Sequence, residues 1–225
     1  GSLNKGYADK YSDIDIICIT RKKIGLVSLK EQILKLNKNA KIIGKQIQFD
    51  YNVTITSIIL KKFSDLVQKA KTIKKRFNLS IYKEIYFLKD YKVIEGDKTD
   101  IQKIIKLIPS KLSEEFIEEE FNNLYPWIIN NISESGRLEI EIKRKNIISF
   151  EYRFSRTVGW LIKLIYEVNG ILFEDARWAI KEIPKMKIKP KNFIKRLETC
   201  LKNKNLNTKL KLLRSIVYDF NAILK

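Results

Sequence analysis

Apolar and polar residues alternate along two segments in the first quarter of the chain. Residues 13–20 read Asp-Ile-Asp-Ile-Ile-Cys-Ile-Thr, and residues 46–56 put Ile47, Phe49 and Tyr51 on one face and polar residues on the other. Successive side chains of a strand point to opposite faces, so both segments predict strands.

Most of the remaining chain has apolar residues at helical spacing. Residues 137–149 have a second interpretation as extended chain, because Leu138, Ile140 and Ile142 alternate with charged residues. The pattern predicts helices over residues 26–37, 58–77, 80–91, 98–107, 113–131, 137–169, 173–183, 190–202 and 206–224. Strand and helix patterns alternate only before about residue 95, which predicts an α+β protein with one domain over 1–95 and a helical domain over 96–225.

The residue types restrict the possible chemistry. The chain contains no histidine, which excludes histidine-based catalytic triads and histidine metal ligands. A metal site must therefore use oxygen ligands, which favours Mg²⁺ or Mn²⁺. Cys18 and Cys200 are too few and too far apart in sequence to indicate a disulfide framework.

Positive charge is in large excess, with 45 Lys and Arg against 26 Asp and Glu and a net charge of +19. This favours an anionic partner, either a nucleic acid or a phosphate-bearing small molecule. The alternative is that lysine simply covers the solvent faces of the helices. The sequence has no apolar run of membrane-spanning length and no secretory pattern at its start, so we expect a cytoplasmic protein without membrane contact.

Three carboxylates form the candidate chemical site. Asp13 and Asp15 point to the same face of the first predicted strand, with Cα atoms about 7 Å apart. Asp50 lies on the polar face of the second predicted strand. Carboxylates at this spacing can bind two metal ions about 4 Å apart. Gly1 and Ser2 form a turn whose N–H groups and hydroxyl suit a phosphate.

The order Gly1-Ser2, Asp13-Ile14-Asp15-Ile16 and Phe49-Asp50-Tyr51 resembles the nucleotidyltransferase superfamily typified by DNA polymerase beta, and in particular its members that modify antibiotics and other small molecules. The resemblance covers about the first 55 residues. It implies an N-terminal mixed-sheet catalytic domain and an all-α substrate-binding or lid domain. In the family a helix and a strand precede Gly-Ser, so we expect residues 1–95 to lack them.

The resemblance also implies a reaction and residue roles. A nucleoside monophosphate, AMP from ATP in most members, passes to a hydroxyl, and pyrophosphate leaves. Asp13, Asp15 and Asp50 would hold two Mg²⁺ (or Mn²⁺) ions, and Gly1 and Ser2 would hold the outer phosphates. The acceptor is expected to be a small molecule. The alternatives are an RNA or protein acceptor, or a non-catalytic nucleotide-binding or antitoxin-type protein.

The helical half contains further candidates for nucleotide contact. Arg177 and Lys181 lead a set of helix-surface cations that suit phosphates, and the others are Arg153, Arg156 and Lys163. Trp160, Tyr166 and Trp178 have rings that suit base stacking, although aromatic residues at this spacing also suit a helical core. The acidic run from Glu114 to Glu120 fits the first turns of a helix that begins near Ser113 better than a site for a cationic acceptor.

Overall fold

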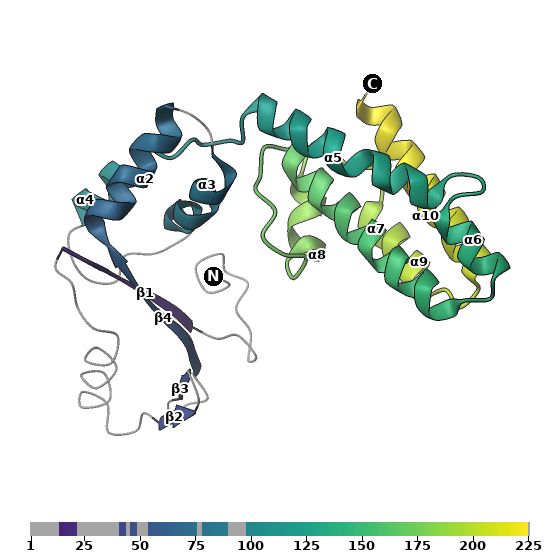
Figure 1. Cartoon of the computed structure of the whole chain (residues 1–225), viewed down its shortest axis with the longest axis horizontal. Coiled ribbons are helices and arrows are strands. Elements are labelled where there is room, and N and C mark those ends of the chain that lie inside the picture. Colours follow the sequence, from purple (N-terminus) through teal and green to yellow (C-terminus); the bar gives the residue numbers. More distant parts are fainter. Residues whose placement is uncertain are drawn as a thin grey trace. The chain divides into compact units, whose positions relative to one another are not determined.

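The computed structural model describes residues 14–21, 41–43, 46–48, 54–75, 78–89 and 98–224 (Figure 1). Contacts between residues divide the chain into two compact units, Gly1–Ser110 and Lys111–Lys225. The expected domains at 1–95 and 96–225 stay a prediction.

Among its described residues, the first unit has four strands. They are β1 (Ile14–Thr20), β2 (Lys41–Ile43), β3 (Gln46–Gln48) and β4 (Thr54–Lys62), in the spatial order β1-β4-β3-β2. β1 runs parallel to β4, whereas β3 is antiparallel to both β4 and β2.

The prediction of an α+β fold with an N-terminal mixed-sheet domain was wrong. Apart from this small sheet, the part of the chain that the structure describes is overwhelmingly helical and supports an all-helical fold class. Two of the four strands have only three residues each. The described core consists instead of apolar side chains from helices and the turns between them. Amphipathic helical stripes therefore outweigh the short alternating segments in forming the fold.

The described helices of the first unit are α2 (Phe63–Lys75), α3 (Leu79–Tyr86) and α4 (Lys98–Ile105), with the 3₁₀ turn η1 (Phe87–Lys89) after α3. The buried residues of α2, Leu66, Ala70 and Ile73, recur at intervals of four and three. The expected helix over 58–77 was wrong at its start, because residues 58–62 complete β4. β-branched side chains and pairing with β1 keep this segment extended.

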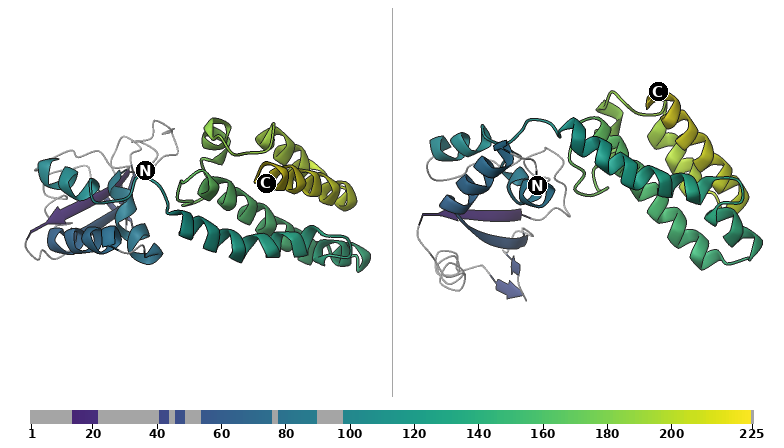
Figure 2. Two further views of the ribbon diagram at one scale, coloured as in Figure 1. Left: turned by 90° about the horizontal axis from the view of Figure 1, so that it is seen from above. Right: turned by 45° about the horizontal axis from the view of Figure 1, so that its top comes forward.

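The second unit is a helical bundle in which α5 packs along α7 and α9 packs along α10 (Figure 2). Phe150, Phe154 and Leu161 of α7 and Phe220 of α10 are fully buried in its core. The bundle is made of α5 (Glu114–Ile132), α6 (Arg137–Lys143), α7 (Ile147–Val168), α8 (Ala179–Glu182), η2 (Ile183–Lys185), α9 (Phe193–Lys202) and α10 (Leu206–Leu224).

Helix α5 begins as the sequence predicts. The Ser113 hydroxyl accepts a hydrogen bond from Phe116 N–H, and Glu114 and Glu115 occupy the first turn. Carboxylates there are stabilised by the partial positive charge of the helix N-terminus. This confirms the helix-start interpretation of the acidic run. Further along, Glu120 forms an ion pair with Lys163 of α7.

Two predicted helices were too long. Residues 137–169 form α6 and α7, because Lys145 adopts a positive φ of 55° and the Asn146 side chain caps α7 by accepting from Ser149 N–H. Residues 137–143 are nevertheless helical, so the extended interpretation of 137–149 was wrong. Only 179–182 of the predicted helix 173–183 are α-helical.

The side chain of Asn169 organises the turn after α7. Its amide nitrogen donates to Ile165 O and Ile188 O, at 2.7 and 2.8 Å, and its oxygen accepts from Lys187 N–H and Ile188 N–H. Gly170 follows with a φ of +74°, which is the left-handed conformation that ends many helices. One side chain thus ties the end of α7 to the segment before α9.

Candidate functional site

Most of the sequence-predicted carboxylate site lies outside the described residues. Asp13, Asp50, Gly1 and Ser2 are all among the residues that are not described. Asp15 lies in β1, where its backbone pairs with Ser57 of β4. The structure therefore bears on this site only through the backbone pairing of the neighbouring strands.

The strand register brings three strand ends to one edge. Ile55, at the start of β4, pairs with Ile14 at the start of β1 and with Ile47 near the end of β3. Asp13 directly precedes β1, and Asp50 belongs to the connection of residues 49–53 between β3 and β4. The described residues nearest in sequence to Asp13 and Asp50, which are Ile14 and Gln48, therefore lie at this edge.

The ladder between β1 and β4 is irregular at this edge. Ile14 pairs with Ile55, but Asp15 pairs with Ser57, so Thr56 is an additional residue on β4. Such bulges increase local twist and change the direction of nearby side chains, and they are common next to active sites.

Arg177 and Lys181 lie around the start of α8, and both are exposed. The backbone N–H of Arg177 donates to the Asp175 carboxylate at 2.6 Å, and Lys181 Nζ lies 5.1 Å from the centre of the Trp178 ring. Tyr166, a predicted stacking residue, is buried and donates to Glu182 at 2.7 Å. Its ring is therefore part of the core.

No three Asp, Glu or Cys side chains are close enough to share a metal ion within residues 14–21, 41–43, 46–48, 54–75, 78–89 and 98–224. Two of the three predicted ligands, Asp13 and Asp50, fall outside these ranges.

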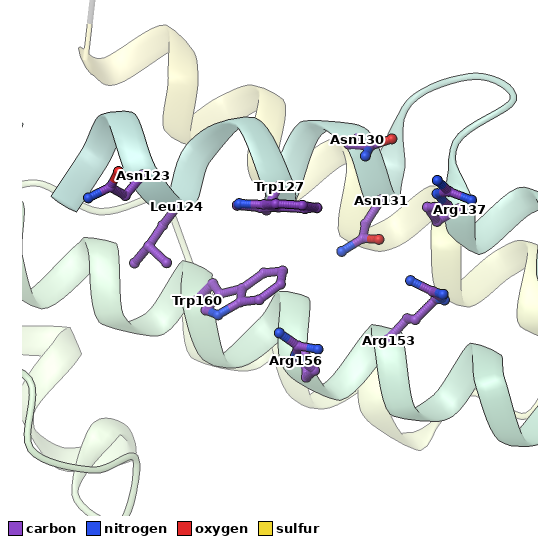
Figure 3. Close-up of a pocket in the computed structure, with 9 residues that line it drawn as sticks. All are labelled: Asn123, Leu124, Trp127, Asn130, Asn131, Arg137, Arg153, Arg156 and Trp160. Atoms are coloured by element: carbon purple, nitrogen blue, oxygen red, sulfur yellow. The ribbon is translucent and has the colours of Figure 1, made fainter. Parts of the chain in front are cut away.

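A groove of about 670 Å³ opens on the second unit, between α5 and α7 (Figure 3). Two tryptophans face its centre, Trp127 from α5 and Trp160 from α7. Trp127 is 59% exposed, which is unusual for so large an apolar side chain. Asparagine side chains of α5 complete the wall on that side.

Three arginines line the same groove. Arg153 and Arg156 project from α7, and Arg137 is the first residue of α6. The guanidinium of Arg156 lies 4.7 Å from the centre of the Trp160 ring, a cation–π distance. Arg153 Nε lies 3.5 Å from a carboxylate oxygen of the buried Glu141. None of the nine side chains that line the groove is acidic.

The turn between α5 and α6 holds Arg137 at the groove. A Cβ atom on Gly136 would lie 2.6 Å from Asn130 O and 2.8 Å from Ser133 O, so only glycine allows this close approach. Arg214 of α10 fastens the turn by donating to the carbonyls of Ile132 and Ser133.

Comparison of this chain with family models, curated proteins and solved structures found no match. The nucleotidyltransferase resemblance accordingly rests on the motif residues alone. None of the described helices has the length and apolar character needed to cross a membrane.

Sequence reasoning found only part of the groove. It singled out Arg153, Arg156 and Trp160, which do line the groove, but not Arg137 or Trp127. Trp127 comes from a different helix, so its meeting with Trp160 depends on how α5 packs on α7. The available signal was an arginine directly after the glycine that separates two helical patterns.

The contacts of Glu139 of α6 predict that the turn between α5 and α6 loses stability in acid. Hydrogen bonds from Arg214 and then Lys143 and the Ser135 N–H lower the pKa of Glu139 to about 2 from an ordinary value of 4.5. A lowered folded-state pKa contributes stability above the unfolded-state pKa, and that contribution is lost as pH falls from about 4.5 toward 2.

We therefore expect Glu139→Gln to lower the midpoint of thermal unfolding at neutral pH, and this deficit to disappear as the pH approaches 2. The measurement is a set of melting curves for both proteins between neutral pH and pH 2. Glu134→Gln, at an exposed position in the same turn, serves as the control. A deficit of equal size at both ends of the pH range would contradict the assignment.

Proposed function

We propose that the chain is a magnesium-dependent nucleotidyltransferase. It moves a nucleoside monophosphate, with AMP from ATP favoured, onto a hydroxyl of a small molecule. The proposal rests first on the ordered motif of Gly1-Ser2, Asp13 and Asp15, and Asp50.

The strand register gives the main support. Ile55 pairs both with Ile14, which follows Asp13 in the chain, and with Ile47, which comes three residues before Asp50. Carboxylates gathered at one point repel one another unless cations neutralise them. With no histidine in the chain, an all-oxygen set of ligands suits Mg²⁺ or Mn²⁺.

In the proposed reaction, the nucleoside monophosphate moves from the triphosphate to the acceptor hydroxyl. The acceptor oxygen bonds to the α-phosphorus, the bond from that phosphorus to the bridging oxygen breaks, and the electron pair leaves with pyrophosphate. Asp13, Asp15 and Asp50 would hold the metals, and Asp50 would also take the proton of the acceptor hydroxyl. When bound, the metal ions supply charge stabilisation at the phosphates. Gly1 and Ser2 hold the outer phosphates, and Arg177 and Lys181 are candidate phosphate contacts.

Incubation with each of the four ribonucleoside triphosphates tests the proposal. Each triphosphate carries its label on the α-phosphate and is supplied with Mg²⁺ and a cell extract separated into small-molecule, RNA and protein fractions. We expect labelled product in the small-molecule fraction with ATP, together with pyrophosphate release. Label in the RNA or protein fraction would mean that the acceptor is RNA or protein and not a small molecule. The absence of a metal-dependent product with all four triphosphates would overturn the proposal.

A further inference from the structure

The groove between α5 and α7 combines three features that point to one kind of ligand. It contains several guanidinium groups, an exposed indole, and no acidic side chain among its nine lining residues. It lies wholly within the second unit, Lys111–Lys225, so its chemistry is independent of the proposed carboxylate site.

The arginines provide positive charge that the described residues leave largely uncompensated. Among those residues, neither Arg137 nor Arg156 has a carboxylate within ion-pair distance, and only Arg153 has one, that of Glu141. Like charges that converge on one cleft are stabilised by an anion, and guanidinium groups suit phosphate because they donate two parallel hydrogen bonds.

The tryptophans provide flat surfaces for stacking. The Arg156 guanidinium lies over the Trp160 ring, whereas Trp127 is mostly exposed to solvent. An exposed aromatic ring beside cations is the arrangement on which nucleic-acid-binding proteins stack bases. Figure 3 shows Trp127 and Trp160 in the middle of the groove, with Arg137 and Arg153 toward one end.

The size of the groove limits the ligand. Sites for small molecules commonly have volumes of about 300–1,000 Å³, and the groove falls within that range at about 670 Å³. An inorganic anion alone would leave the indoles unused, and a purely apolar ligand would leave the arginines uncompensated.

We propose that this groove binds a nucleoside phosphate, either free or as a unit of single-stranded RNA. The base stacks on Trp127, and Arg137 and Arg153 hold the phosphate. Asn123 and Asn130 of α5 also line the groove and offer amide groups for hydrogen bonds to the ligand.

Binding to the full chain in EDTA tests the proposal. Removal of divalent metal disables a carboxylate site that needs Mg²⁺, so binding that persists in EDTA belongs elsewhere. The probes are AMP and ATP, followed by quenching of tryptophan fluorescence, and fluorescein-labelled ten-residue oligoadenylate and oligouridylate, followed by anisotropy. We expect at least one class of probe to bind in EDTA.

Two groove variants and two controls locate the binding. Trp127→Ala and Arg137→Gln each remove an exposed side chain and are expected to weaken affinity about tenfold or more. Tyr218→Ala and Lys211→Gln change an exposed aromatic and an exposed cation on α10, outside the groove, and should leave affinity unchanged. Melting curves verify that all four variants are folded.

The salt dependence distinguishes the two sources of the ligand. If RNA is the ligand, the logarithm of affinity falls steeply with the logarithm of salt, and Arg137→Gln reduces that slope by about 0.7. If a free nucleotide is the ligand, AMP or ATP competes fully with the oligonucleotide. The proposal fails if neither class binds in EDTA, or if both groove variants bind like the controls. Failure here leaves metal-dependent labelling untouched, so the two proposals fail separately.

Discussion

Replacing Asp15 by asparagine is expected to abolish nucleotide transfer, lowering the rate by roughly 10³-fold or more. Asparagine keeps the size of the side chain but removes the negative charge that would hold a divalent cation. Asp15 lies in β1 and its backbone pairs with Ser57, and this pairing needs only main-chain atoms. The variant should therefore fold like the natural chain and fail only in chemistry.

The measurement is release of pyrophosphate and labelling of the acceptor over a range of Mg²⁺ and Mn²⁺ concentrations. Asp13→Asn should behave in the same way. Asp65→Asn is the matched control, because Asp65 is an exposed carboxylate in the first turn of α2 of the same unit. Activity of Asp15→Asn within about twofold of the control would rule out the proposed metal-holding role.

Local sequence patterns predicted the helices well where the signals were local. Ser113 caps α5 through a bond to Phe116, three residues away, where the sequence predicts the helix to begin. Asn146 caps α7 through Ser149 in the same local way, but the predicted helix over 137–169 ran through it. The 3.6-residue period located α10 at residues 206–224. Signals of this kind need no knowledge of the tertiary structure.

The errors over residues 58–62 and in the fold class arose where a distant partner decides the conformation. Residues 58–62 have apolar residues compatible with either element, and pairing of Ile58 and Ile59 with β1 makes them extended. The predicted fold class was wrong for a similar reason. Alternation of apolar and polar residues indicates where a strand can form, but it does not indicate how long the pairing with a neighbouring strand will be. β3 pairs with β4 at only two positions, Ile47 and Gln48.

The groove could not be predicted from the sequence for a related reason. Arg137 reaches it only because Gly136 permits a close approach to Asn130 O, and Trp127 faces Trp160 only because α5 packs on α7. An exposed and a buried tryptophan also look alike in a helical pattern. The packing of helices, which is a property of the whole bundle, therefore assembled the cationic and aromatic side chains.

Phe154→Ala is expected to lower the free energy of unfolding of the helical unit by about 3–5 kcal/mol. Phe154 is fully buried in α7, and its ring stacks with that of Phe150 at a centroid distance of 5.8 Å. Its other neighbours include Lys209, whose Nζ lies 4.7 Å from the ring centre and donates to Glu151 at 2.7 and 2.8 Å. The substitution thus leaves a cavity and removes a contact of a buried ammonium group.

Urea unfolding followed by tryptophan fluorescence measures this loss specifically. All three tryptophans of the chain, Trp127, Trp160 and Trp178, belong to the second unit, so their emission reports that unit even if the two units unfold separately. Tyr152→Ala is the matched control, since it removes an aromatic ring from the same helix at a position that is 62% exposed, and it should cost less than about 1 kcal/mol. Equal destabilisation by the two substitutions would mean that the buried ring of Phe154 contributes no more to stability than an exposed ring. A large loss confined to Phe154→Ala would show that the stability of α7 depends on the core packing of Phe154. The groove wall formed by Arg153 and Trp160 depends on the same packing, because both residues belong to α7.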